Sequence, residues 1–173
     1  MIRVFIGYDD NEKVAFSTLS HSLLKHSTQP LAITPIRLQN IKDIFVRERL
    51  PIQSTEFAFS RFIVPYLCNY SGHAIFMDCD MLARGDISKL WRQRTTKYAV
   101  QCVQQHQFKW LESEELIGHV DVEWNHLVGE YQYNHNAKLV HFTEGGPYFK
   151  DYKDCHYADE WFEAYEDTTK VNM

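Results

Sequence analysis

The stretch AIFMDCDML, residues 74–82, joins a short apolar run to two aspartates that are separated by one residue. The run 74–77 indicates a buried strand, and Asp78 and Asp80 follow at its carboxyl end, where open α/β sheets bind their ligands. Alternate residues of an extended chain point to the same face, so the two Cα atoms lie about 7 Å apart and both carboxylates can reach one cation. Hard carboxylate oxygens suit Mg²⁺ or Mn²⁺, and such ions leave positions open for substrate phosphates. The stretch therefore predicts a metal site for a diphosphate-bearing substrate, although an isolated Asp-x-Asp also occurs as a solvated pair at a strand end.

Length and composition indicate one globular domain. A chain of 173 residues can bury a sizeable core, and its 45% hydrophobic and 14% aromatic residues argue against disorder. The net charge is −5 and the basic residues form no long block, so we expect no nucleic-acid partner. The four cysteines show no Cys-x-x-Cys spacing, which favours reduced thiols over a zinc site or a disulfide framework.

The sequence contains no signal for membrane insertion. Its apolar segments are all shorter than the roughly 20 residues that a membrane span needs. The first residues, MIRV, lead directly into an apolar run without the pattern of a signal peptide. We therefore expect a cytoplasmic protein with no membrane span.

The amino-terminal part has the pattern of an opening α/β unit. Residues 3–7 form a short apolar run, residues 14–26 show helical spacing of apolar side chains, and residues 30–37 predict a second strand. The polar loop after the first strand offers Asp9 to a uracil N–H and Asn11 to a ribose hydroxyl. The same residue types also turn the chain and cap helices, so both interpretations stay open.

Two arginines are candidates for binding phosphate. Residues 54–67 predict a helix that is interrupted or kinked near Pro65. Arg61 stands among apolar residues of this segment, where a guanidinium needs either a phosphate or an acidic partner; a structural salt bridge or an exposed side chain is the alternative. Arg84 could neutralise phosphate charge near the metal, but a surface position beside Asp86 is the simpler interpretation.

The rest of the chain predicts further elements of the same kind of fold. In chain order, they are a turn at Gly85, a short helix begun by Asp86, a strand over 98–103, an amphipathic segment over 108–120, a strand over 138–142 and a closing helix over 157–165 that packs on the sheet. Together the pattern predicts a single α/β domain with a central, mostly parallel sheet flanked by helices.

His141 stands at the end of the last predicted strand, before the loop TEGGPYF, residues 143–149. An imidazole in this place is suited to be a third metal ligand, and the backbone at Gly145 can approach a ligand closely. A lone histidine is, however, more often structural.

Four features in this order resemble glycosyltransferase family 8, which has the nucleotide-diphospho-sugar transferase (GT-A-like) fold: the polar loop after the first strand, the Arg61 helix, the FMDCD strand and the His141 loop. The Asp-x-Asp strand with the following LARGDISKLW, residues 82–91, is the most specific match. The segment HFTEGGP, residues 141–147, resembles the family's carboxyl-terminal His-x-x-Gly-x-x-Lys-Pro-Trp signature. The similarity covers about residues 2–107 and 124–165.

This resemblance implies metal-dependent transfer of a hexose from a UDP-sugar to the hydroxyl of an unidentified acceptor, with retention of configuration. It implies Mn²⁺ or Mg²⁺ as the cofactor and requires no covalent nucleophile. The implied site consists of three metal ligands, Asp78, Asp80 and His141, and of four residues that contact the donor, Asp9, Asn11, Arg61 and Gly145.

The chain departs from the family in two places. Gly146 stands where the signature has lysine, so a positive charge near the diphosphate is missing unless Lys150 or another residue supplies it. The region between about 107 and 124 is shortened and lacks elements that floor the sugar and acceptor site. A catalytically impaired nucleotide-sugar-binding module is therefore the alternative function, and apolar surface exposed by the shortening would favour a homo-oligomer. A haloacid dehalogenase-type phosphotransferase is disfavoured, because the Asp-x-Asp of that family lies near the amino terminus, whereas here it stands at residues 78–80.

Overall fold

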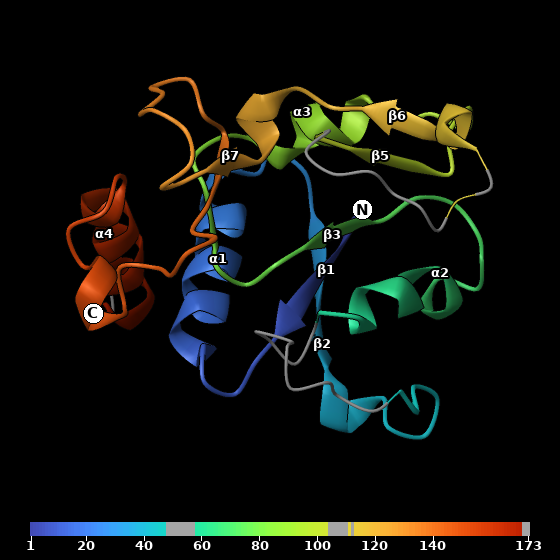
Figure 1. The fold of residues 1–173 in the computed structure, drawn as a ribbon, viewed down its shortest axis with the longest axis horizontal. Helices are drawn as coiled ribbons and strands as arrows, with labels where there is room; N and C mark the ends of the chain where they lie inside the picture. Colours follow the sequence, from blue (N-terminus) through green and yellow to red (C-terminus); the bar gives the residue numbers. More distant parts are fainter. Residues whose placement is uncertain (48–57, 104–110, 112, 171–173) are drawn as a thin grey trace.

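A computed structural model describes residues 1–47, 58–103, 111 and 113–170 of the chain. It contains three small sheets with helices packed around them (Figure 1). The first sheet has the order β2-β1-β3 and is entirely parallel; it consists of β1 (Ile2–Tyr8), β2 (Leu31–Arg37) and β3 (Ile75–Met77). β1 is the central strand of this sheet, and a central parallel strand is covered on both faces, which accounts for its nearly continuous apolar run.

The remaining strands form two smaller sheets. The second sheet has the order β4-β8-β7, built from β4 (Met81–Ala83), β8 (Leu139–His141) and β7 (His126–Leu127). The third pairs β5 (Val100–Cys102) with β6 (Ile117–His119) in parallel. Among the described strand pairs only β4 and β8 are antiparallel, so the mostly parallel α/β architecture is confirmed, with its strands divided among three sheets.

Strand β4 was not expected, because the sequence predicts only a turn at Gly85 in this region. All three of its residues are buried, and they pair with β8. A strand of three apolar residues shows no alternation from which its period can be read. Its partner β8 lies far along the chain, so only tertiary structure identifies it.

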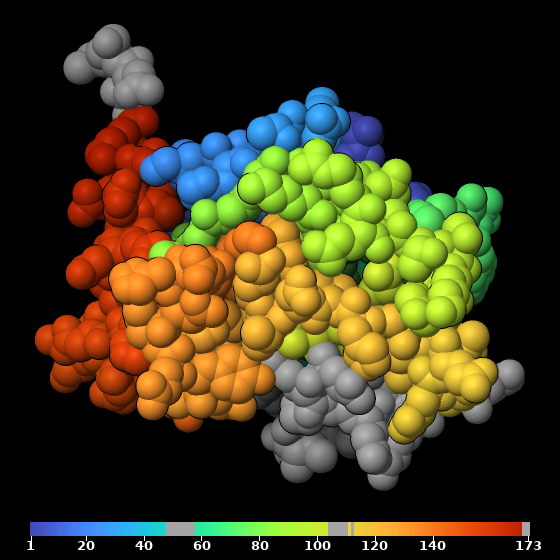
Figure 2. All heavy atoms as spheres, turned by 90° about the horizontal axis from the view of Figure 1, so that it is seen from above, coloured from blue at the N-terminus to red at the C-terminus, as the bar shows by residue number. Residues whose placement is uncertain are grey.

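Two helices pack side by side at one end of the molecule. α1 (Lys13–His26) connects β1 to β2, and it contacts both β4 and α4 (Ala158–Thr169) (Figures 1 and 2). The buried positions of α1 recur at helical spacing: Ala15, Thr18, Leu19, Ser22 and Leu23. Trp161 of α4 packs in one core cluster with Leu82 of β4 and Val140 of β8, so the predicted closing helix on a sheet is confirmed.

The segment around Pro65 differs from its prediction. Residues 54–57 lie outside the described residues; Ser60–Ile63 form the 3₁₀ turn η2, and Val64–Leu67 form the short helix α2. Pro65 stands in the first turn of α2, where its missing N–H costs no intrahelical bond, so proline begins this helix and does not kink it.

The short helix after Asp86 is confirmed as α3 (Ile87–Arg92), because Asp86 is its N-cap and accepts a hydrogen bond from the Ser88 N–H. The amphipathic segment expected over 108–120 is only partly described; its described part contains a 3₁₀ turn followed by strand β6. That turn is η3 (Glu114–Leu116); the other 3₁₀ turns of the described residues, besides η2, are η1 (Leu38–Asn40), η4 (Val122–Trp124) and η5 (Lys150–Tyr152).

All four cysteines are unpaired, as the sequence predicts. Among the described residues, no helix has the length and the apolar character that crossing a bilayer requires.

Candidate metal centre and donor site

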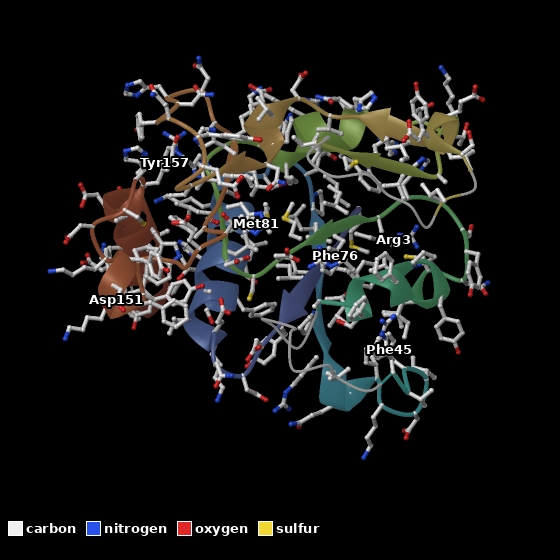
Figure 3. All side chains as sticks on the ribbon, in the orientation of Figure 1. Arg3, Phe45, Phe76, Met81, Asp151 and Tyr157 are labelled. Carbon is white, nitrogen blue, oxygen red and sulfur yellow. The ribbon has the colours of Figure 1, made fainter. Side chains whose placement is uncertain are left out.

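The two aspartates and His141 meet at the junction of the first and second sheets. Asp78 follows β3, Asp80 precedes β4, and His141 is the last residue of β8. The antiparallel register pairs Met81 with His141, and the Phe142 N–H donates to the Asp80 carbonyl at 2.9 Å. This pairing brings one ligand atom of each of the three side chains to within 4.8 Å of the others. Phe76 and Met81 lie on either side of the aspartate segment in Figure 3.

The imidazole of His141 lies directly against both carboxylates. Its Nε2 is 3.2 Å from Asp80 Oδ1 and 3.8 Å from Asp78 Oδ2. Its Nδ1 lies 3.0 Å from Asn125 Oδ1. An amide oxygen only accepts, so Nδ1 carries the proton in this contact and Nε2 is directed toward the aspartates. Such a partner on the far nitrogen is the usual way in which proteins orient a metal-binding histidine.

Asn125 was missed as a site residue, because the sequence indicates only a turn there. Its role depends on the pairing of β7 with β8, which brings residues 126–127 beside 140–141. The chain around Asn125 has no local pattern that would show this.

The buried oxygens of this cluster fit a divalent cation. Asp78 Oδ1 and Asp80 Oδ1 are buried, and each lies against a charged or chargeable group, Arg61 Nη2 at 3.0 Å and His141 Nε2 at 3.2 Å. Buried carboxylate oxygens are costly unless they are paired or coordinate a metal. Two carboxylates and one imidazole are a donor set that suits Mn²⁺ or Mg²⁺, so the residues present fit the predicted cofactor.

The charges of the cluster shift the proton affinities of its members. Burial raises the pKa of Asp78; the Arg61 guanidinium opposes this shift, and the negative charge of Asp80 adds to it. Burial lowers the pKa of His141, but the hydrogen bond to Asp80 and the charges of Asp80 and Asp78 outweigh it, so that the pKa is raised. Both groups therefore hold protons more readily than in solution.

Arg61 of η2 is the positive charge beside the cluster. Its Nη2 lies 3.0 Å from Asp78 Oδ1, and its guanidinium carbon lies 5.2 Å from the centre of the Phe76 ring. An acidic side chain therefore satisfies this arginine in part, while its buried Nε has no hydrogen-bond partner among the described residues. A contact between Arg61 and a donor phosphate stays a prediction.

Asp9 and Asn11 lie in the loop between β1 and α1. Asp9 is buried, and its Oδ1 accepts a hydrogen bond from the Asn11 N–H at 2.9 Å, so it turns the chain as one of the two interpretations expects. It does not cap the helix, because the N-cap of α1 is Glu12. The predicted contacts with a nucleoside stay predictions.

The loop after His141 depends on two glycines. Gly145 has a φ of +143°, and a Cβ there would lie 2.6 Å from the Tyr152 ring. A Cβ at Gly146 would lie 2.2 Å from Cε1 of Tyr148. Lys150, the candidate replacement for the signature lysine, is exposed in η5.

Arg84 is not the surface residue beside Asp86 that the simpler interpretation expects, and its contribution to phosphate charge stays a prediction. Its Nε and Nη2 donate to the two carboxylate oxygens of Glu160 in α4, at 2.5 and 3.2 Å. Nη1 donates to the carbonyl of Ala137 at 2.5 Å, and the guanidinium lies over the Tyr157 ring. Arg84 is thus largely buried and ties β4 to α4, a partnership that its sequence neighbour Asp86 did not indicate.

No protein-family model matches the chain. Among curated proteins it is similar to Protein CDI of Arabidopsis thaliana, with 34% identity over 229 residues that cover 98% of this chain and 88% of the relative. The chain belongs to the Protein CDI family.

The alignment with Protein CDI spans 229 residues, more than the 173 of this chain, so the Arabidopsis protein contains segments that have no counterpart here. A shortening at about 107–124 stays a prediction for this CDI family member, and residues 104–110 and 112 lie outside the described residues.

Solved glycosyltransferases share the fold of this CDI family member. Apo-form GlyE from Streptococcus pneumoniae TIGR4 superposes with a TM-score of 0.64 at 11% identity and covers 95% of this chain, which spans 60% of GlyE. The bifunctional glycosyltransferase WbbM gives 0.69 at 12% identity, over 95% of this chain and 49% of WbbM. LgtC in complex with donor and acceptor sugar analogs gives 0.65 at 9% identity, over 99% of this chain and 98% of LgtC. The CDI family member therefore has the nucleotide-diphospho-sugar transferase (GT-A-like) fold that its sequence predicts.

Proposed function

We propose that the chain is a glycosyltransferase of the family 8 type, which transfers a hexose from a UDP-sugar to an acceptor hydroxyl with retention of configuration and with Mn²⁺ or Mg²⁺ as cofactor. The observation that carries this proposal is the meeting of Asp78, Asp80 and His141 beside Arg61, at the carboxyl end of β3. Open α/β sheets bind ligands at this end of their strands. A fold in common with LgtC, whose solved complex contains donor and acceptor sugar analogs, adds support.

In the proposed reaction, the bond between the anomeric carbon and the diphosphate breaks, and a glycosidic bond forms to the acceptor oxygen on the same face of the sugar. The acceptor proton passes to the β-phosphate of the departing UDP, so no covalent intermediate with the protein is needed. When bound, the divalent cation supplies Lewis-acid stabilisation of the charge on the departing diphosphate. Asp78, Asp80 and His141 would hold it, and Asn125 would keep the imidazole oriented.

The remaining predicted residues would act on the donor. Arg61, whose side chain is 37% exposed and pairs with Asp78, would place a positive charge beside the diphosphate. Asp9 and Asn11 would contact the nucleoside from the loop after β1. Gly145, whose φ of +143° favours glycine, would shape the backbone after His141 that meets the donor.

Calorimetric titration with UDP, in the presence and absence of Mn²⁺, tests the proposal. We expect binding that requires the metal and that is lost in the variant Asp78→Asn/Asp80→Asn, because the amides keep the shape of the side chains but remove both charges. Release of UDP from UDP-sugars in the presence of candidate acceptors then tests turnover.

A matched control is Asp43→Asn, which makes the same chemical change at an exposed aspartate far along the sequence from the cluster. This variant should bind UDP and Mn²⁺ as the unaltered chain does. Absence of UDP binding to the unaltered chain with either metal would contradict the proposed function.

The alternative is a nucleotide-sugar-binding module without transfer activity. The specific observations that favour it are Gly146 in place of the signature lysine and the segments that Protein CDI has in addition. Metal-dependent UDP binding without acceptor-stimulated release of UDP would favour this alternative.

A further inference from the structure

Glu12 connects three segments that form the proposed site. It is the N-cap residue of α1 and follows the Asp9 turn directly. Its Oε2 accepts a hydrogen bond from the Tyr148 hydroxyl at 2.6 Å, across 136 positions of sequence. The thiol of Cys79, which stands between the two aspartates, donates to the same oxygen at 3.9 Å. One carboxylate oxygen therefore joins the loop after β1, the Asp-x-Asp segment and the loop after β8.

The ring of Tyr148 is held from two sides. Its hydroxyl is fixed by Glu12, and the ring packs against Trp161 of α4 with 5.3 Å between the ring centres. The ring also occupies the space that a side chain at position 146 would need, since a Cβ there would lie 2.2 Å from Cε1. The lysine of the family 8 signature is therefore incompatible with the observed position of Tyr148. The replacement of that lysine by Gly146 and the contact between Tyr148 and Glu12 form one structural feature.

A carboxylate at position 12 is energetically unfavourable for a contact that only stabilises the fold. Burial raises the pKa of its carboxyl, although the hydrogen bond from Tyr148 opposes the shift, and the negative charges of Asp80, Asp9 and Asp78 raise the pKa further. A loop can be anchored by apolar packing without placing a fourth carboxylate near three others. The place of this contact, between the two loops that flank the metal cluster, suggests why a polar anchor is present.

We propose that Glu12 and Tyr148 are positioning residues, whose hydrogen bond holds the loop 142–149 against the loop after β1 so that both loops can contact one nucleotide diphosphate. This inference rests on the proposed function for its ligand. Through the loop, the contact would fix the backbone at Gly145 and the direction from which it meets the donor. Neither residue is assigned a contact with the reacting atoms.

Hydrogen–deuterium exchange of the protein without ligand tests the hold on the loop. The amides of Gly145 and Phe149 make backbone hydrogen bonds within this loop, at 3.0 and 2.9 Å. Tyr148→Phe removes only the hydroxyl, and we expect it to raise the exchange of these amides about three- to tenfold, the range that the loss of one hydrogen bond produces. Exchange in α3 should not change.

Calorimetric titration of the same variant tests the positioning role. We expect UDP with saturating Mn²⁺ to bind about three- to tenfold more weakly to Tyr148→Phe. Glu12→Ala should have the same effect, whereas Glu12→Gln keeps an oxygen that accepts from the tyrosine hydroxyl and should restore most of the affinity. If the contact served stability alone, the variants would have lower melting temperatures, but their UDP affinities would not show this loss and recovery.

Tyr157→Phe is the matched control. It removes the hydroxyl of a buried tyrosine, which accepts a hydrogen bond from the Asn134 N–H and donates to the Asn134 carbonyl, outside the proposed site. We expect it to change stability but neither UDP affinity nor exchange in the loop 142–149.

Gly146→Ala supplies an independent test, because its methyl group should displace the Tyr148 ring. As a single substitution it should weaken UDP binding. In a Tyr148→Ala background it should weaken UDP binding little further, because no ring remains to be displaced. Additive effects of these two changes would contradict the coupling.

Unchanged exchange in Tyr148→Phe would overturn the inference, and so would faster exchange with unchanged UDP affinity. If the unaltered chain binds no UDP at all, the proposed function fails and the positioning role falls with it, while the exchange experiment still decides whether the contact holds the loop.

Discussion

At the scale of single residues, the cluster depends on how His141 is oriented. The hydrogen bond from Nδ1 to Asn125 Oδ1 leaves Nε2 facing the two aspartates. A metal ligand held in this way binds more tightly because its rotation is already restricted. Asn125 is therefore as much a part of the proposed metal site as the three ligands.

Asn125→Ala should weaken Mn²⁺ binding about 10- to 100-fold, because the imidazole loses the acceptor that fixes its orientation. Titration followed by electron paramagnetic resonance of free Mn²⁺ measures this affinity. Asn125→Asp keeps an acceptor oxygen and should lose less of the Mn²⁺ affinity. Equal affinity of Asn125→Ala and the unaltered chain would show that Asn125 does not support the ligand.

Mn²⁺ affinity should fall as the pH is lowered through the raised pKa of His141, above the ordinary value of about 6.5, because the ion competes with a proton for Nε2. In the metal-free protein, the contribution of His141 to folding stability has the opposite pH dependence. A histidine whose pKa is raised by folding contributes stability that is present at low pH and is lost as the pH rises through the folded-state pKa.

Melting temperatures of the metal-free chain and of His141→Gln at pH 6 and pH 8 measure this stability difference. The difference in melting temperature between the unaltered chain and the variant should be larger at pH 6 than at pH 8. Calorimetric Mn²⁺ titrations at the same two pH values should show tighter binding at pH 8, and a pH-independent Mn²⁺ affinity would contradict the ligand role of His141.

At the scale of elements, Asp86 shows how one side chain begins a helix and attaches it. Its Oδ1 accepts from the Ser88 N–H at 2.9 Å and from the Thr28 N–H at 3.2 Å. The Thr28 hydroxyl donates to Oδ2 at 2.7 Å. The same carboxylate thus caps α3 and binds it to the turn after α1, next to the second sheet.

Asp86→Ala should lower the free energy of unfolding by about 1 kcal/mol, as expected for the loss of an N-cap. Burial raises the pKa of Asp86, but hydrogen bonds from Ser88 and Thr28 outweigh it and hold the pKa well below its usual value. This contribution is therefore present above the unfolded-state pKa of about 3.9 and is lost as the pH falls through the folded-state pKa. Urea unfolding at pH 7 and pH 3 should show a smaller difference between the two proteins at pH 3; an equal difference would contradict a role for the charge.

At the scale of the whole molecule, the proposed metal site joins two sheets. Asp78 follows the first sheet, and both Asp80 and His141 adjoin the second. A cation bound there would link residues far apart in the sequence and would bind the folded state only. Metal binding should therefore raise the free energy of unfolding of the whole fold.

Mn²⁺ at about 100 times its dissociation constant should stabilise the fold by about 2.7 kcal/mol, which corresponds to a rise in melting temperature of about 5–10 °C for a chain of this size. Thermal unfolding with Mn²⁺, and again after addition of EDTA, measures this shift. Asp78→Asn/Asp80→Asn should show no shift, and a shift in that variant would place the ion elsewhere.

Much of the local structure follows from local pattern. The apolar run of β1, the helical spacing of α1 and the cap at Asp86 are properties of neighbouring residues, so sequence alone predicts them. The strand β4 and the division into three sheets depend on partners distant in the chain. For such features the local sequence contains too little information.

The same distinction holds in the site. Asp78 and Asp80 are two residues apart at the end of a strand, so covalent geometry by itself brings their carboxylates together, and the sequence predicts them as a pair. His141 was a candidate by its residue type and its loop, but only the antiparallel pairing of β4 with β8 places it beside Asp80. Asn125, the partnership of Arg84 with Glu160 and the contact of Glu12 with Tyr148 were decided by tertiary structure alone. Each of them joins residues whose separation along the chain exceeds any local period, so only the packing of the folded sheets and helices could bring them into contact.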